Sequence, residues 1–315
     1  MLVIAEELDQ TADLVIEELR RRSVAVMRFD LAAFPQKIRL VAENHGSWRG
    51  CLSDARRAVR LEEVGAVYWR RPGRPVIAET VPAPYDEWAG EEALGALMGV
   101  LYALPAVWVN RPELDGIASH KPVQLRIATA CGLQVPRSII TNDLAAARRF
   151  ADSIDGQLIC KTVLGGRLNH ANGRRTGVPT HLVEGGDLDQ TLELTAHYLQ
   201  EWIPKEHEVR LTVVGEEFFA ATIHAGSEGA KVDWRTDYDS LSYGVTDVPD
   251  DVRVGVLAWM RRFGLTFGAF DFAVTPEGRW VMFECNPAGQ WGWIQERTGL
   301  PICRAVTDLL MTGIR

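Results

Sequence analysis

The chain has 315 residues, of which 47% are hydrophobic and 24% are charged, and its formal net charge is -8. This is the composition of an ordinary globular protein, and its length exceeds that of a usual single domain, so we expect two or three domains. The negative charge argues against a nucleic-acid partner, and no uninterrupted apolar run is long enough to cross a bilayer. We therefore expect the chain to bind neither nucleic acid nor a membrane.

The first third of the chain predicts an α/β domain. A short apolar run, an amphipathic helix with Thr11 as its N-cap and a second apolar run, together Leu2–Phe29, have the spacing of a βαβ unit with parallel strands. Three short antiparallel strands, a further sheet strand, a helix and a last strand follow: Ile38–Ala42, Trp48–Leu52, Ala58–Leu61, Val67–Trp69, Tyr85–Leu104 and Val107–Val109.

The middle of the chain predicts two helices, a strand and a glycine-rich loop. The helices are His120–Cys131 and a segment that Thr141–Asp143 caps and that runs through Ser153, and the strand is Gln157–Val163. The loop Leu164–Pro179 combines four glycines with three arginines: Gly165, Gly166, Gly173, Gly177, Arg167, Arg174 and Arg175. Flexible backbone with positive charge suits a lid over a polyphosphate, and an ordinary surface loop is the alternative.

The last part begins with the strand Tyr198–Ile203 and a hairpin, Val209–Val214 with Phe218–Ala225, in which Glu208 and Arg210 share a face. The amphipathic helix Val252–Phe263 and the closing helix Ile302–Met311 stand on either side of a second hairpin.

That second hairpin, Gly268–Gln290, holds the candidate metal ligands. A type I turn at Thr275–Gly278 predicts a register in which Asp271 faces Met282, so that Asp271, Met282, Glu284 and Asn286 project from one face. Asp271 and Glu284 would be diagonal neighbours roughly 7 Å apart, close enough to bind one or two cations. Oxygen ligands of this kind favour Mg²⁺, while a solvated hairpin face is the alternative.

The remaining polar residues indicate a reducing compartment and no zinc site. The five cysteines form no CxxC pair, so we expect reduced thiols in a cytoplasmic protein. The seven histidines include no HExxH motif. By strand alternation, Cys285 should point away from its neighbours Glu284 and Asn286 into the core.

The order of these features resembles the ATP-grasp superfamily from about Pro112 to the C-terminus. The matching features are a lysine before a helix, a strand lysine followed by a glycine-rich lid, a Gln-Glu-aromatic-Ile strand, a strand Glu-x-Arg, and an aspartate followed by Glu-x-Asn. They stand here at Lys121, Lys161, Gln200–Ile203, Glu208 with Arg210, and Asp271 with Glu284–Asn286. The implied architecture is α/β, with α+β character in the C-terminal half. It comprises a pre-ATP-grasp domain (1–112), a central ATP-grasp subdomain with the lid (113–195) and a C-terminal subdomain with the metal and substrate sites (196–315).

The resemblance also implies the cofactors, ATP and Mg²⁺, and a role for each residue. Lys121 and Lys161 would hold the nucleotide phosphates, and Lys161 would also take part in catalysis. Glu201 with the backbone of Trp202 and Ile203 would contact adenine, and Glu208 would lie near the ribose. Arg210 would stabilise charge on the transferring phosphoryl group. The metal would be held by Asp271, Glu284 and Asn286.

A narrower resemblance is to the graspetide, or microviridin-type, maturases of ribosomal peptides. It rests on motifs across nearly the whole chain: Tyr68–Pro72, His120–Leu125, Trp202–Lys205, Val232–Arg235 and Asn286–Trp293. Such enzymes join Asp or Glu side chains of a precursor peptide, made of a leader and an acidic core, to Ser or Thr hydroxyls or to Lys amines. Asp233 and Arg235 resemble the motif that recognises the core peptide, a local surface ion pair being the alternative. A homodimer is left open.

Two other classes remain at this stage. A ligase of free amino acids or small peptides, of the glutamate-adding type, would share the nucleotide site. A nucleotide-binding protein without ligase activity would share the fold. ADP formation that depends on an added precursor peptide would separate the maturase from both.

Overall fold

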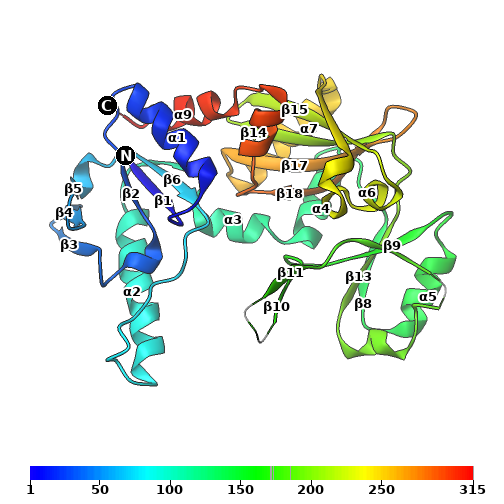
Figure 1. Ribbon diagram of the computed structural model, residues 1–315, viewed down its shortest axis with the longest axis horizontal. Coiled ribbons are helices and arrows are strands. Elements are labelled where there is room, and N and C mark those ends of the chain that lie inside the picture. The colour runs from blue at the N-terminus through cyan, green and yellow to red at the C-terminus, as the bar shows by residue number, and fades with distance from the viewer. Residues whose placement is uncertain (171, 173, 185, 315) are drawn as a thin grey trace. The chain divides into compact units, whose positions relative to one another are not determined.

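The predicted βαβ unit is present in the computed structural model (Figure 1). Strand β1 (Leu2–Ala5) pairs in parallel with β2 (Met27–Phe29), and helix α1 (Gln10–Arg21) connects them. The N-cap of α1 is Asp9, whose Oδ1 accepts a 2.7 Å hydrogen bond from the amide of Ala12. The prediction of Thr11 as the N-cap is therefore wrong, because Asp9, two residues earlier, accepts from a free amide of the first turn.

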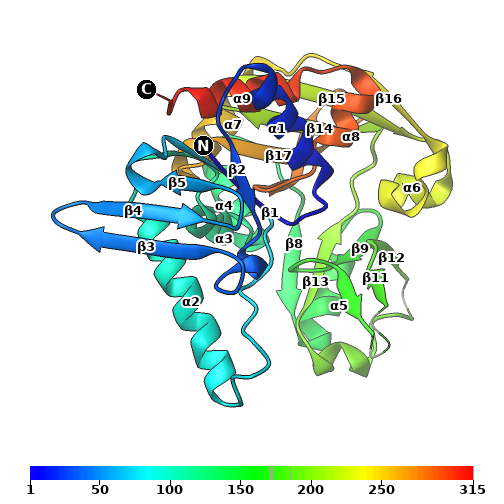
Figure 2. The same cartoon turned by 60° about the vertical axis from the view of Figure 1, so that its left-hand side comes forward.

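The parallel sheet has the order β2-β1-β6-β7, completed by β6 (Ala66–Arg70) and β7 (Val107–Val109). The predicted antiparallel excursion is the separate sheet β3-β4-β5, and the long helix α2 (Tyr85–Tyr102) lies beside it in Figure 2. The three strands are β3 (Arg39–Asn44), β4 (Trp48–Ser53) and β5 (Ala58–Arg60). None of the described helices, α2 included, is long and apolar enough to cross a membrane.

The structure describes residues 1–170, 172, 174–184 and 186–314, and these form two compact units. Unit 1 contains residues 1–115, 265–267 and 288–315, and unit 2 contains residues 116–264 and 268–287. Unit 1 thus includes helices α8 (Gly292–Thr298) and α9 (Ile302–Met311), of which α9 packs on α1. This grouping puts residues 288–315 with the N-terminal part of the chain, and the three-part division drawn from the sequence remains a prediction.

Unit 2 is built on two antiparallel sheets of order β12-β9-β13-β8 and β16-β15-β14-β17-β18. The first contains β8 (Ser138–Thr141), β9 (Leu158–Lys161), β12 (His181–Val183) and β13 (His197–Glu201). The second contains β14 (His207–Val214), β15 (Glu217–Ala225), β16 (Leu241–Val245), β17 (Phe267–Val274) and β18 (Trp280–Asn286).

The helices assigned between residues 112 and 263 are α3 (Pro112–Ala118), α4 (Lys121–Ala130), α5 (Leu144–Asp152), α6 (Glu228–Val232) and α7 (Asp250–Phe263). Five short 3-10 helices complete the described structure: η1 (Leu31–Ala33), η2 (Leu61–Glu63), η3 (Gln190–Leu194), η4 (Trp234–Thr236) and η5 (Tyr238–Ser240).

The predicted lid contains a two-stranded ribbon, β10 (Arg167–Asn169) with β11 (Arg175–Gly177). Of the residues on which the lid prediction rests, Gly173 and the side chains of Arg167 and Arg175 lie outside the described part of the structure. The closing of this loop over a ligand remains a prediction.

The hairpin β17–β18 has a different register from the one predicted. Asp271 pairs directly with Glu284, and Met282 pairs with Phe272 on the opposite face. The turn is a three-residue loop, because the amide of Thr275 donates to the carbonyl of Arg279 at 3.0 Å and a glycine adopts the left-handed conformation at φ +80°. A bulge then leaves Phe283 without a cross-strand partner, which shifts the pairing once more.

The buried carboxyl group of Asp115 makes the stability of unit 1 depend on pH. Burial raises the pKa of Asp115 to about 7, although a hydrogen bond from Asn110 and the charge of Arg70 oppose the rise. The folded chain therefore keeps a proton that the unfolded chain releases above about pH 4. As a result, the free energy of unfolding falls as the pH rises from about 4 to about 7 and stays lowered above that.

We expect Asp115→Asn to reduce this slope and to raise stability at pH 8, as measured by urea unfolding at several pH values. The matched control is Asp86→Asn at an exposed position of the same unit. An unchanged slope in Asp115→Asn would show that the burial of this carboxyl group does not cause the pH dependence.

Candidate active site

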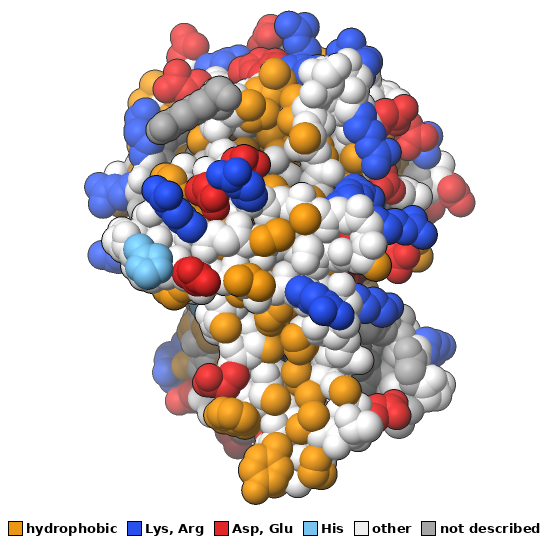
Figure 3. Space-filling view, turned by 90° about the vertical axis from the view of Figure 1, so that its left-hand side faces the viewer, with side chains coloured by type: hydrophobic (Ala, Val, Ile, Leu, Met, Phe, Trp, Pro, Cys, Tyr) orange, Lys and Arg blue, Asp and Glu red, His pale blue; other side chains and the backbone are white. Residues whose placement is uncertain are grey.

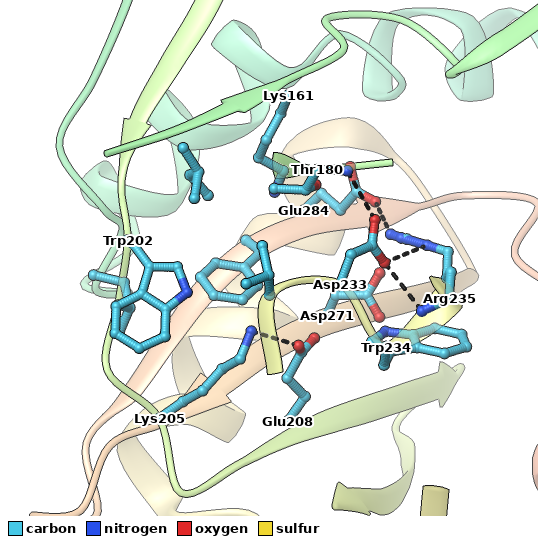
Figure 4. Close-up of a pocket in the computed structure, with 14 residues that line it drawn as sticks. Lys161, Thr180, Trp202, Lys205, Glu208, Asp233, Trp234, Arg235, Asp271 and Glu284 are labelled. Carbon is cyan, nitrogen blue, oxygen red and sulfur yellow. Dashed lines mark hydrogen bonds and ion pairs between the residues drawn. The ribbon is translucent and has the colours of Figure 1, made fainter. Parts of the chain in front are cut away.

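A cavity lies between the two antiparallel sheets of unit 2 (Figure 4). Lys161, at the end of β9, faces it from the smaller sheet, while Asp271 and Glu284 on β17 and β18 face it from the larger sheet. A second, larger cavity adjoins the first and shares Lys161, Thr180, Asp233, Arg235 and Glu284 with it. The chemistry-bearing side chains therefore stand where the two cavities meet.

Two carboxylates and an amide converge at this junction. The Nδ2 atom of Asn286 lies 3.4 Å from Oδ2 of Asp271 and 3.4 Å from Oε1 of Glu284. Asp271 is 5% exposed, so the solvated hairpin face that remained open from the sequence is wrong. The expectation that Asp271, Glu284 and Asn286 share one face holds despite the register error, since the bulge restores their alignment.

Cationic side chains surround the two carboxylates. The Nζ atom of Lys121 lies 3.1 Å from Oε2 of Glu284, and Nη1 of Arg210 lies 3.0 Å from Oδ1 of Asp271. Lys121 also donates a 3.0 Å hydrogen bond to the carbonyl of Thr162, directly after Lys161. The side chain of Arg210 is buried against the carboxylate of Asp271, and it lines neither cavity.

Burial and charge act in opposite directions on these groups. Burial raises the pKa of the Asp271 carboxyl group, and the charge of Arg210 opposes that rise. Burial would also raise the pKa of Glu284, but the charges of Lys161 and Lys121 outweigh it and lower this pKa. Burial lowers the pKa of the Lys161 ammonium group, with Glu284 acting against it.

The donor set fits a magnesium ion. The side-chain nitrogen of Asn286 lies within reach of both carboxylates. Rotating the side-chain amide by half a turn exchanges its nitrogen and oxygen, so that the oxygen faces the space between the two carboxylates. Within the described part of the chain, no cluster of three or more His, Cys, Asp or Glu side chains could hold a metal. A cation here would thus complete its shell with water and ligand oxygens, as Mg²⁺ does.

The far end of the smaller cavity is lined by aromatic and charged residues. Trp202 and Ile203 follow β13, and the amide of Trp202 donates to the carbonyl of Gln157 at 2.9 Å. Lys205 forms a 2.6 Å ion pair with Glu208, and both side chains are nearly buried. The sequence assigned no role to Lys205, although its spacing of three residues from Glu208 could have suggested the pair.

The Asp233–Arg235 segment lies at the junction of the cavities. The carboxylate of Asp233 accepts a 3.0 Å hydrogen bond from the amide of Thr180, and its other oxygen lies 3.6 Å from Nε of Arg235. The guanidinium group of Arg235 stacks on Trp234, with 5.2 Å to the ring centroid, and lies 3.8 Å from Glu284. Arg235 keeps 43% of its side chain exposed, so it can still take a second anion.

Gln124, within the motif His120–Leu125, contributes to this site in a way that its position in the motif does not indicate. Its side-chain oxygen accepts a 2.8 Å hydrogen bond from the amide of Cys285, and its Nε2 donates to the carbonyl of the same residue at 2.7 Å. Cys285 lies on β18, the edge strand of its sheet, between Glu284 and Asn286. Gln124 therefore replaces a neighbouring strand and fixes the backbone that carries two of the proposed metal ligands.

The cysteines agree with the sequence interpretation. Cys285 is buried, as predicted, and all five cysteines are free thiols. These thiols add no metal ligand at the junction of the two cavities.

Comparison with known proteins defines the class. Residues 1–115 match the family described as MvdD pre-ATP grasp domain. The macrocyclase MdnC from Microcystis aeruginosa MRC, solved bound with precursor peptide MdnA, is 27% identical over 99% of both chains, with a TM-score of 0.86. A RiPP-associated ATP-grasp ligase from Chryseobacterium gregarium, solved with ADP and a leader and core peptide, is 28% identical over 99% of this chain and 96% of that one, with a TM-score of 0.89.

The macrocyclase MdnB from Microcystis aeruginosa MRC is also similar, at 28% identity over 98% of both chains and a TM-score of 0.81. No match was found among curated proteins. The fold is therefore an ATP-grasp fold preceded by a pre-ATP-grasp domain, which confirms the predicted fold class. Within that superfamily, the chain is similar over nearly its whole length to macrocyclases and a ligase of ribosomally made peptides.

We expect Gln124→Leu to destabilise the chain by roughly 2–4 kcal/mol, because it removes both side-chain hydrogen bonds to the buried backbone of Cys285. Gln124→Glu should fall between this variant and the parent chain, since it keeps the acceptor for the amide. Urea unfolding measures both. Gln36→Leu, at an exposed glutamine, is the matched control; a Gln124→Leu chain as stable as this control would contradict the bracing role.

Proposed function

We propose that the chain is an ADP-forming, ATP-dependent ligase that cyclises a ribosomally made precursor peptide. A side-chain carboxylate of the peptide would take the γ-phosphoryl group of ATP, releasing ADP. A Ser or Thr hydroxyl, or a Lys amine, would then attack the acyl carbon and displace phosphate, forming an ester or an amide. The observation that carries this proposal is the convergence of Asp271, Glu284 and Asn286 with Lys121 and Lys161 where two cavities meet.

The cationic side chains support the binding of a polyphosphate. Lys161 and Lys121 approach the junction from two elements. Because Lys161 is buried, the low dielectric around it strengthens the attraction between its ammonium group and a nearby phosphate. Both would hold nucleotide phosphates as point charges. Arg210 would act through Asp271, whose carboxylate it holds, so we propose for it a positioning role beside the phosphoryl group.

The adenine would lie at the far end of the smaller cavity. The amide of Trp202 already donates to Gln157, and Oε2 of Glu201 accepts a 3.3 Å hydrogen bond from the amide of Arg137, so adenine would be read by the amide of Ile203 and the backbone carbonyl of Glu201. Glu208 would accept from the ribose while Lys205 holds it in place.

The metal site would be formed by Asp271, Glu284 and Asn286. Mg²⁺ bound there would neutralise charge on the phosphates during transfer. Lys121 would keep Glu284 ionised and oriented, and Gln124 would keep Glu284 and Asn286 on a fixed backbone.

The larger cavity would receive the acidic core of the peptide. Arg235 stands at its junction with the smaller cavity, exposed on one side and oriented by Asp233 and Trp234 on the other. A substrate with several carboxylates needs one guanidinium group to hold a carboxylate while another is activated. MdnC was solved with a precursor peptide and the Chryseobacterium gregarium ligase with a leader and core peptide, which supports a peptide over a free amino acid. A cytoplasmic location and a homodimer are parts of the same proposal.

Glu284→Gln should abolish Mg²⁺-dependent ADP formation and peptide modification, because the amide cannot supply the charge that the metal requires. ADP release by a coupled assay and peptide mass by mass spectrometry measure the two effects, with circular dichroism as the control for folding. The similar substitution Glu277→Gln, at the exposed turn of the same hairpin, should have no effect. AMP and pyrophosphate as products would contradict the proposed reaction.

Arg235→Ala should lower peptide modification at least tenfold while the affinity for Mg-ADP changes little, because Arg235 is proposed to hold the peptide. Arg235→Lys should restore only part of the rate, since it keeps the charge but loses the two-pronged geometry and the stacking on Trp234. Arg279→Ala, at an exposed arginine in the turn between β17 and β18, is the matched control. Equal losses in nucleotide binding and in modification would refute the assignment.

A further inference from the structure

Phe283 lies next to Glu284 in the chain and faces the same cavity. Met282 pairs with Phe272 on the opposite face of the hairpin. Glu284 pairs with Asp271 on the face of the site. The bulge inserts Phe283 between these two pairs, so that Phe283 and Glu284 both line the smaller cavity. No step of the proposed reaction uses this ring.

The ring of Phe283 contacts the ammonium groups of two lysines. The Nζ atom of Lys161 lies 5.0 Å from the ring centroid, and that of Lys205 lies 5.4 Å from it. Both distances are within the roughly 6 Å over which the negative face of an aromatic ring attracts a cation. In Figure 4 the two lysines extend toward each other from opposite sides of the view. The ring therefore attracts both charges at the wall of one cavity.

The two lysines differ in what else holds them. Lys205 forms its 2.6 Å ion pair with Glu208, and its side chain is 8% exposed. Among the residues that the structure describes, no hydrogen bond or ion pair engages the ammonium group of Lys161, on which Glu284 acts only through its charge at longer range. The described contact that orients this ammonium group is therefore the one with Phe283.

A lysine without a carboxylate partner is ordinary where water surrounds it. On the face shown in Figure 3, Lys and Arg side chains stand at the surface among Asp and Glu side chains. Lys161 instead lines both cavities, of which the larger has a volume of about 990 Å³. Because an ammonium group is strongly hydrated, it would turn into the larger cavity unless something attracted it toward the smaller one. The ring supplies that attraction.

We propose that Phe283 is a positioning residue, whose ring face holds the ammonium group of Lys161 at the junction of the cavities where a nucleotide phosphate would bind. The inference rests on the proposed function, which assigns phosphate binding to Lys161. The contact is kept when phosphate binds, so that the ammonium group lies between the ring and the anion. Holding the lysine there raises the fraction of chains that are competent to bind, and the apparent affinity rises in proportion.

The same ring makes it easier for two ammonium groups to line one cavity. Like charges repel more strongly where water is excluded than in bulk solvent. A negative ring face within reach of both Lys161 and Lys205 lowers this repulsive cost. An aliphatic side chain of similar size would fill the same space without this charge distribution.

Fluorination of the ring tests the proposal in the full chain. Ring fluorines withdraw electron density from the face and weaken its attraction for a cation, while the shape changes little. Chains with one, two or three ring fluorines on Phe283 should bind Mg-tripolyphosphate progressively more weakly, with a total loss of roughly fivefold to thirtyfold. Tripolyphosphate is the probe because it has no base that could stack on the ring. Isothermal titration calorimetry measures the affinity, and urea unfolding checks the fold.

Two ordinary substitutions and a second position serve as controls. Phe283→Leu removes the ring and should lose at least as much affinity as three fluorines do. Phe283→Tyr keeps an electron-rich ring and should restore most of the affinity. Phe219 is buried on β15, and no described cation lies over its ring, so three fluorines there should leave the affinity unchanged.

Three results would overturn the role of Phe283. One is an affinity for Mg-tripolyphosphate that stays level or rises with fluorination, and another is an equal loss when Phe219 is fluorinated. The third is a loss confined to adenosine, measured in parallel, because the ring would then stack on the base. A parent chain that binds neither Mg-tripolyphosphate nor Mg-ATP would instead contradict the proposed function.

Discussion

The site depends on two carboxylates held directly opposite each other. Asp271 and Glu284 face one another across β17 and β18 in surroundings that exclude most water, where like charges repel strongly unless they are compensated. Arg210 compensates the first carboxylate and Lys121 the second. The same arrangement makes the junction a place where a divalent cation and a polyphosphate can bind together, since each reduces the electrostatic cost of the other.

The surrounding backbone keeps this pair in place. Strand β18 lies at the edge of its sheet, where unpaired amides and carbonyls would otherwise leave it free to move. Helix α4 supplies both Lys121, which contacts Glu284, and Gln124, which binds the backbone of Cys285 one turn later. The carbonyl of Gln134, beyond the end of α4, adds a third point by accepting a 2.8 Å hydrogen bond from the amide of Met282. One helix and the segment after it thus fix the charge and the geometry of the site.

The sequence predicted the alternation of helices and strands well, because apolar spacing and capping residues act locally. It placed α9 at Ile302–Met311 correctly and brought Asp271 and Glu284 to one face. It predicted the wrong register for the hairpin β17–β18, because the residues around Thr275–Gly278 can form turns of different lengths and the loop has one residue more than predicted. The bulge at Phe283 was not predicted, because it depends on packing in the folded chain. Gln124 was missed because its partner, the backbone of Cys285, is brought to it only by the three-dimensional fold. The adjoining cavities are likewise a property of the folded chain.

The central claim is that the chain activates a peptide carboxylate by phosphorylation, and the transfer of oxygen tests it most directly. An acid- and Thr-rich precursor peptide labelled with ¹⁸O in its side-chain carboxylates is incubated with the protein, ATP and Mg²⁺, and the released phosphate is analysed by mass spectrometry. The account predicts one ¹⁸O atom in phosphate for each ring formed, because the acyl phosphate keeps the carboxylate oxygen when the hydroxyl or amine displaces it. Ring formation with unlabelled phosphate, or with the label in AMP, would contradict it.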